Sequence, residues 1–211
     1  TIHMNTKRRI LSAMLSFLLF ILSTANGATL YTGVPVNGLV GLGQPRFQTV
    51  DTGWMATVPN GYVRVFVGPS AADAERWVKH RVADLAAINP QPNEGFAASI
   101  RVDEAHGDGV GTLIFRSKNV AVSSRSKVNA TEWASKLLHA IVIAPHPWPS
   151  PPVLSIKGKH WVIEAPPESL HVSYVGGITV DSPSLRFVQP PYRIISWDSW
   201  GRAAWTEVSL P

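Results

Sequence analysis

The sequence predicts an α+β fold: a ferredoxin-like split βαβ sheet with two helices, followed by a β-rich C-terminal part. Two stretches carry apolar residues at helical spacing behind a capping residue, and segments of β-forming residues separate them. A proline-rich segment then occupies residues 146–152, and residues 153–211 contain short strand-like segments with turn residues between them. We therefore expect an α+β domain over 28–145, a stiff linker over 146–152 and a β-rich region over 153–211.

Residues 1–27 have the pattern of a secretory signal peptide, with residues 1–3 as a tag remnant. Residues 7–9 are basic, and residues 10–22 are apolar and uncharged. This apolar stretch is shorter than the roughly 20 residues that span a bilayer. Small residues predict cleavage after Gly27. We therefore expect a periplasmic or secreted protein, which contacts the membrane only if it keeps its leader.

The charge and the lack of cysteine exclude several classes of protein. Three of the 19 basic residues lie in the leader, which has no acidic residue, so its removal lowers the formal charge from +5 to +2. The remaining basic residues are scattered among acids, which excludes a nucleic-acid-binding surface. With no cysteine in the chain, disulfides, a thiol nucleophile and a lipid-modified cysteine are excluded too. These features fit a bacterial envelope protein.

The first expected elements lie in residues 28–92. Residues 28–59 are rich in glycine and predict an extended, loop-like segment at the start of the domain, with one edge strand over 54–58. Residues 62–67, Tyr-Val-Arg-Val-Phe-Val, predict a strand. A helix is expected after Ser70, because Asp73 completes a capping box three residues on. Its apolar stripe comprises Ala74, Trp77, Val78, Val82 and Leu85, and Glu75 is spaced to pair with Lys79 on the outer face.

The next elements complete the predicted ferredoxin-like order. Apolar residues alternate with polar ones over 96–102, which predicts a half-buried strand. Residues 110–116 and 120–124 flank a short loop and predict a hairpin. A second helix is expected after Asn129, with Trp133 and Leu137 in its apolar stripe. The resulting order places both helices on one face of a largely antiparallel sheet.

Six short strands are expected in the β-rich region, over 153–156, 160–165, 170–175, 185–188, 192–197 and 203–210. Prolines or glycines mark turns between them. Two arrangements are compatible with this pattern. In the first, the strands form a small sandwich or barrel of their own; in the second, they extend the first sheet.

An acidic cluster formed by Asp103, Glu104, His106 and Asp108 has residue types that bind divalent cations. The spacing does not match a calcium loop, because Ala105 and Gly107 occupy ligand positions. Flanking glycines favour a tight turn with local carboxylate hydrogen bonds. We predict no metal site and no cofactor.

Ser124 and Lys127 have the Ser-x-x-Lys spacing of penicillin-recognising enzymes. In those enzymes both residues lie on one helical turn, whereas here a strand precedes them and the helix begins only after Asn129. Their companion motifs are also missing from the sequence. We therefore predict that Ser124 is not a nucleophile, and an exported hydrolase is the third of three functional hypotheses.

The C-terminal region has an unusual concentration of tryptophan. The candidate binding residues are Trp197, Asp198, Trp200, Arg202 and Trp205, with Trp197 and Trp205 expected to face each other across a turn. Exposed indoles beside polar groups form platforms for sugar rings or partner side chains. The alternative is that two of these tryptophans close a small β core.

The leading hypothesis is a non-catalytic envelope protein that binds another macromolecule through its sheet edges and its tryptophan-rich C-terminal surface. The expected partner is another envelope or extracellular protein. The second hypothesis is a cell-wall or glycan-binding module.

Overall fold

The computed structural model describes residues 32–36, 42–85, 91–144, 147–176, 179–181, 186–187 and 189–208. The predicted leader, residues 1–27, lies outside the described residues. The described part contains three helices and several antiparallel sheets, which confirms the α+β class. Within that part, no helix has the length and apolarity needed to cross a membrane.

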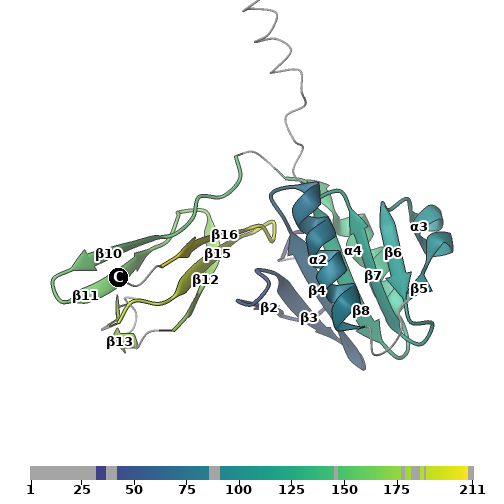
Figure 1. Cartoon of the computed structure of the whole chain (residues 1–211), viewed down its shortest axis with the longest axis horizontal. Helices are drawn as coiled ribbons and strands as arrows, with labels where there is room; N and C mark the ends of the chain where they lie inside the picture. Colours follow the sequence, from purple (N-terminus) through teal and green to yellow (C-terminus); the bar gives the residue numbers. More distant parts are fainter. Residues whose placement is uncertain are drawn as a thin grey trace, which may run out of the picture. The chain divides into compact units, whose positions relative to one another are not determined.

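The first part of the chain forms a seven-stranded sheet in which every neighbouring pair is antiparallel (Figure 1). Its strands in spatial order are β2 (Pro45–Phe47), β3 (Trp54–Val58), β4 (Gly61–Val67), β8 (Val120–Ser126), β7 (Thr112–Ser117), β6 (Glu104–Gly107) and β5 (Gln91–Pro92). The strand predicted over 54–58 is present, but it lies second in the sheet, and the short β2 forms the edge. A separate pair joins β1 (Thr32–Gly33) to β9 (Val142–Ile143).

The predicted helix after Ser70 is α2, Ala71–Asp84. The Ser70 hydroxyl oxygen accepts a hydrogen bond from the Asp73 backbone N–H at 3.2 Å and donates to the Asp73 carboxylate at 2.6 Å. These contacts satisfy one of the backbone N–H groups that a helix start leaves without an intrahelical partner. On the outer face Lys79 donates to Glu75 at 2.6 Å, as its i, i+4 spacing predicts.

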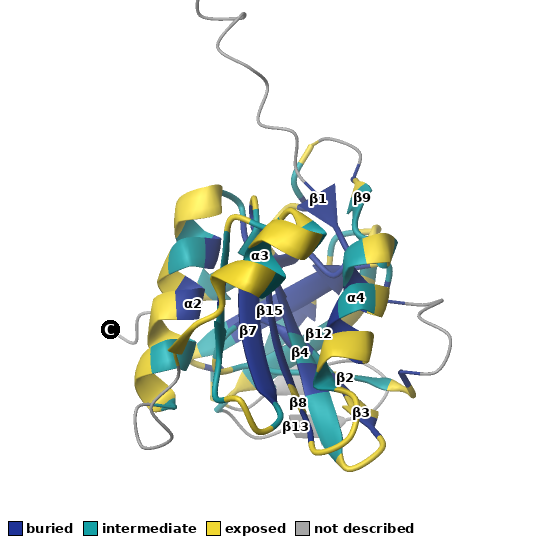
Figure 2. Ribbon diagram, turned by 90° about the vertical axis from the view of Figure 1, so that its right-hand side faces the viewer, coloured by how far each residue is buried: buried dark blue, intermediate teal, exposed yellow. Residues whose placement is uncertain are grey.

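The two long helices lie on opposite faces of the sheet (Figure 2), so the prediction that both cover one face is wrong. Phe66 and Ile114 pack against Trp77 of α2. Their immediate neighbours Val65 and Phe115 pack in the core that contains Trp133, which belongs to α4 (Ala130–Ala140). Successive strand residues point to opposite faces of the sheet. Because the central strands are apolar at consecutive positions, other elements must bury apolar side chains on both faces. The arrangement therefore differs from a ferredoxin-like fold.

The strand predicted over 96–102 is also wrong, because most of this segment forms the short helix α3, Glu94–Ile100. The Asn93 side-chain oxygen accepts from the Phe96 backbone N–H at 3.2 Å and caps this helix. Arg101 ends it in the left-handed conformation, with φ at 57°. The apolar spacing of this segment is compatible with either structure, and the local cap favours the helix.

The strands of the C-terminal region form two sheets of their own and do not extend the seven-stranded sheet. One contains, in order, β10 (Val153–Lys157), β11 (His160–Glu164), β14 (Arg186–Phe187) and β13 (Thr179–Asp181); the other contains β12 (Ser169–Val175), β15 (Arg193–Asp198) and β16 (Ala203–Glu207). Ile163 of the first sheet and Ile194 of the second share a hydrophobic cluster. The two sheets therefore pack face to face as a small sandwich.

The turn between β15 and β16 attaches this sandwich to the first part of the chain. The backbone N–H of Val34 donates to the carbonyl of Trp200 at 2.9 Å, and that of Val36 donates to Ser199 at 3.0 Å. The Trp197 indole N–H donates to the Thr52 carbonyl at 3.0 Å. Three residues of this tryptophan-rich segment, Trp197, Ser199 and Trp200, therefore take part in an internal junction.

An aromatic contact continues the same junction along β12. The ring of His171 stacks on Phe47 of β2 with centroids 4.3 Å apart, and it lies 5.8 Å from the Trp197 ring. His171 is exposed on its other side, but partial desolvation against these rings disfavours the charged imidazole and lowers the pKa of His171.

We expect the junction to lose stability as the pH falls below about 6.5, the ordinary pKa of histidine in an unfolded chain. Because the folded-state pKa is lowered, the unfolded chain binds the proton first, so the contribution of His171 is complete above that pH and declines below it. Thermal unfolding should be measured at pH 5, 6 and 7 for the wild type and His171→Phe, which keeps the stacking but does not titrate. Parallel pH profiles for the two proteins would contradict this expectation.

Candidate functional site

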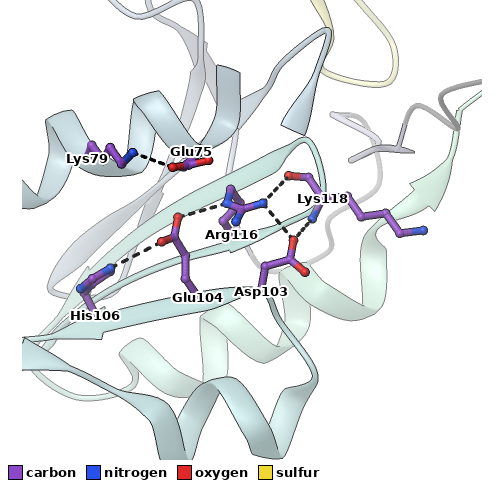
Figure 3. Close-up of polar contacts among 7 residues, drawn as sticks. All are labelled: Glu75, Lys79, Asp103, Glu104, His106, Arg116 and Lys118. Carbon is purple, nitrogen blue, oxygen red and sulfur yellow. Dashed lines mark hydrogen bonds and ion pairs between the residues drawn. The ribbon is translucent and has the colours of Figure 1, made fainter. Parts of the chain in front are cut away.

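In the acidic cluster predicted around residue 103, two of the carboxylates form ion pairs with Arg116 (Figure 3). Arg116 donates to Glu104 at 3.0 Å and to Asp103 at 3.1 Å, and Asp103 also accepts from the backbone N–H of Lys118 at 2.6 Å. His106 lies 3.9 Å from the second oxygen of Glu104. Across the described residues, no three acidic or histidine side chains are grouped to hold a metal ion.

Asp108 stands apart from this cluster and organises a tight turn, as the flanking glycines predict. One of its carboxylate oxygens accepts the backbone N–H groups of Val110, Gly111 and Thr112 at 2.8–2.9 Å. Burial opposes ionisation of this carboxyl, but the hydrogen bonds from Thr112, Gly111 and Val110 outweigh it and hold the pKa of Asp108 well below its usual range.

Replacing Asp108 with alanine is expected to lower the free energy of unfolding by about 2 kcal/mol, because three backbone donors lose a charged acceptor. Asp108→Asn is the matched control, since it keeps an oxygen in the same place and should lose less. Chemical denaturation at pH 7 measures both. Equal losses for the two variants would show that the acceptor geometry is not what stabilises the turn.

Ser124 is fully buried on β8. Its hydroxyl donates to the Ala130 carbonyl at 3.2 Å, next to the start of α4, whereas Lys127 is exposed beyond the end of the strand. This placement supports the prediction that Ser124 is not a nucleophile.

The five predicted C-terminal site residues do not form one exposed surface. Trp197 is fully buried, and Asp198 and Arg202 are each less than 5% exposed. Trp200 is half-buried, and Trp205 is 39% exposed. Trp197 and Trp205 are not cross-strand partners, because Trp197 pairs with Ala203 and Trp205 with Ile195.

Three of the five residues instead meet around a pocket of about 350 Å³, which we name the Trp148–Trp200 pocket. Its lining residues are Pro147, Trp148, Pro149, Ser150, Glu168, Asp198, Ser199, Trp200 and Arg202. Two indoles and two prolines supply apolar walls, while Glu168 and Ser199 are exposed polar groups. Asp198 and Arg202 are the buried charged groups of this pocket.

Asp198 holds the turn that carries Trp200. One of its carboxylate oxygens accepts the backbone N–H groups of Trp200 and Arg202 at 2.9 and 3.0 Å, and the other accepts from Arg202 Nε at 2.6 Å. Both charges are buried, so their pairing depends on this geometry. The ion pair thus fixes the backbone on which Trp200 is presented.

The opposite wall of the pocket is also held in place. Trp148 donates its indole N–H to the Ala203 carbonyl at 3.1 Å, and the Arg202 guanidinium carbon lies 5.4 Å from the centroid of its ring. Glu168 accepts a hydrogen bond from the Ser150 backbone N–H at 3.3 Å. Trp148, Arg202 and Glu168 therefore already have defined contacts in the pocket.

Trp205 lines a different and larger groove of about 640 Å³. One wall is a stripe of α2 that includes Asp73, Trp77 and Arg81, and Val50 lies at the rim, 88% exposed. The arginines that line this groove already have acidic partners in Asp51, Asp73, Asp84 and Glu207.

Sequence reasoning missed Trp148 and Glu168 as members of the site. Trp148 lies among the prolines that predict an extended linker, but it packs against the hydrophobic core that contains Trp133 and donates its indole N–H to the Ala203 carbonyl. The signal that could have identified it is the tryptophan itself, because a large apolar side chain is unusual in a solvated linker.

Neither a family model, nor a curated protein, nor a solved structure gives a significant match to this chain.

Proposed function

We propose that this protein is a non-catalytic, exported envelope protein that binds another macromolecule at the Trp148–Trp200 pocket. The observation that carries the proposal is a pocket lined by two indoles, those of Trp148 and Trp200, and by the buried Arg202–Asp198 ion pair, which orders the turn that carries Trp200. Tryptophan is among the residues that contribute most to binding when they line a pocket. A pocket whose groups are ordered in advance also binds with a smaller entropy cost.

Several groups that could serve in catalysis have structural partners, which supports a binding function. The Ser124 hydroxyl bonds the Ala130 carbonyl, and Asp103 and Glu104 are paired with Arg116. Within the pocket, the Asp198 carboxylate accepts three hydrogen bonds from its own turn.

The sandwich also has strand edges that could extend a binding surface. β10 pairs only with β11 among the described strands, and its Val153 and Ile156 are more than half exposed. An edge strand with exposed apolar side chains is a site where a partner strand can add. We assign this edge a secondary part in binding.

The test is co-sedimentation of the purified full chain with a total envelope fraction from a Gram-negative bacterium. Trp200→Ala is expected to lower the bound fraction at least about tenfold, as loss of a central tryptophan does in many interfaces. Trp205→Ala is the matched control, because it removes a tryptophan of the same hairpin that lies outside the pocket. Absence of envelope binding by the wild type, or equal loss in both variants, would refute the proposal.

Export is tested separately by expressing the full chain in a bacterium. The protein should reach the envelope and begin at or near Ala28. An intact leader on protein recovered from the cytosol would contradict export.

A further inference from the structure

We infer that the Trp148–Trp200 pocket binds one uncharged pyranose ring of a polysaccharide, an inference that rests on the proposed binding function of this pocket. Four observations support it: the apolar walls, the polar rim, the charge balance and the covered strand edge beside the pocket.

The walls match the C–H surface of a sugar ring. Trp148, Trp200, Pro147 and Pro149 surround the pocket with aromatic and aliphatic carbon. The face of an indole carries partial negative charge, so it attracts the weakly positive C–H groups on one side of a pyranose. A volume of about 350 Å³ is at the lower end of the range for ligand pockets, which suits a single ring.

The rim matches the hydroxyl groups of the same ring. Among the described residues, the exposed carboxylate of Glu168 accepts one hydrogen bond, from the Ser150 backbone N–H, and a carboxylate has about four acceptor positions. The exposed Ser199 hydroxyl can both donate and accept. A sugar hydroxyl or an N-acetyl N–H would donate to Glu168 while the ring stacks on an indole.

The charge balance excludes anionic ligands. Arg202 is the basic residue of the pocket, and it is buried in an ion pair with Asp198 at 2.6 Å. The accessible charge is the carboxylate of Glu168, which repels phosphate, sulfate and uronate groups. A neutral or N-acetylated sugar therefore fits better than a charged one.

The strand edge beside the pocket is covered, which disfavours an extended peptide. Trp148 donates to the carbonyl of Ala203, the first residue of β16, and Thr206 donates its hydroxyl to the Pro152 carbonyl at 2.5 Å. Residues 148–152 thus lie along the side of β16 where a peptide strand would have to pair.

The experiment is a titration of the full chain, followed by the indole N–H signals of its tryptophans in NMR spectra, with each signal assigned from a single Trp→Phe variant. The probes are chitotriose, cellotriose and mannotriose, which are all uncharged. At least one probe should shift the Trp148 and Trp200 signals saturably and leave Trp77 and Trp205 unchanged. Because the ligand is uncharged, affinity should vary less than about twofold between 50 and 500 mM salt.

Two variants test the assigned contacts. Glu168→Ala, which also removes the exposed acceptor of the Ser150 N–H, and Trp200→Ala are each expected to weaken sugar binding about tenfold or more. Trp205→Ala should retain wild-type affinity. Sugar binding that is lost in Trp205→Ala but kept in Glu168→Ala would overturn the assignment to this pocket.

The failure of this inference is distinguishable from failure of the proposed function. Absence of a shift with all three probes, together with envelope binding that protease treatment of the envelope abolishes, would replace the sugar with a protein partner. Absence of envelope binding and of any shift would refute both proposals.

Discussion

Replacing Arg202 with alanine should lower the free energy of unfolding by about 3–5 kcal/mol, the cost of removing one partner of a buried ion pair. The guanidinium donates to Asp198 at 2.6 Å, and both side chains are almost completely buried. Without Arg202, the Asp198 carboxylate remains buried with only the two backbone N–H donors of its turn. For a chain of this size, the loss corresponds to a decrease in melting temperature of about 10 °C.

Arg193→Ala provides the control on the neighbouring strand. Arg193 pairs with Glu207 at the same distance, 2.6 Å, but Glu207 is well exposed. An exposed pair of this kind contributes about 1 kcal/mol or less. Thermal and urea unfolding of both variants measures the difference. Similar losses in the two variants would mean that burial does not determine the contribution of the Arg202–Asp198 pair.

Trp197→Ala is the second substitution with a large expected effect, a loss of about 3–5 kcal/mol. Its ring is fully buried between Ile195, Ala203 and Phe47, and its indole N–H donates to the Thr52 carbonyl. Truncation removes apolar burial, leaves a cavity at the junction and deprives that carbonyl of its donor. Trp197 is thus expected to stabilise the fold and not to contact a ligand.

Trp205→Ala distinguishes this effect from a general loss of aromatic residues in the hairpin. Trp205 lies on the same hairpin but is 39% exposed, so its truncation is expected to cost about 1 kcal/mol or less. Urea unfolding monitored by far-UV circular dichroism avoids the fluorescence change caused by loss of an indole. A large loss in Trp205→Ala would show that this residue belongs to the core.

Local signals predicted most of the secondary structure. The Ser70 cap and the apolar stripe behind it define α2, and the two β-forming runs around Lys118 define the β7–β8 hairpin. The positions of the helices could not be predicted from such signals, because the choice of sheet face depends on pairing between distant strands. The consecutive apolar residues 113–115 and 120–122 are the signal that could have identified strands buried on both faces.

The candidate site was predicted only in part. The sequence identified the segment that carries Asp198, Trp200 and Arg202, but it did not show which side chains are buried. The burial of these side chains depends on contacts such as Trp197 with Thr52 and Trp148 with Ala203, which join residues far apart in the chain. No local propensity encodes contacts of this kind.

The hydrogen bonds from Val34 and Val36 to the turn at Ser199 and Trp200 determine when folding can be completed. Gly201 of this turn has φ at 73° and lies so close to the Trp54 indole that a Cβ atom would come within 2.5 Å of its nitrogen. A growing chain on the ribosome can form the helices and hairpins of its first part, but it cannot close this contact until the β15–β16 hairpin has emerged. Closing so long a loop also carries an entropy cost that local hairpins avoid. Newly made protein is therefore expected to remain incompletely folded until Ser199 and Trp200 have left the ribosome and can accept the hydrogen bonds of Val34 and Val36.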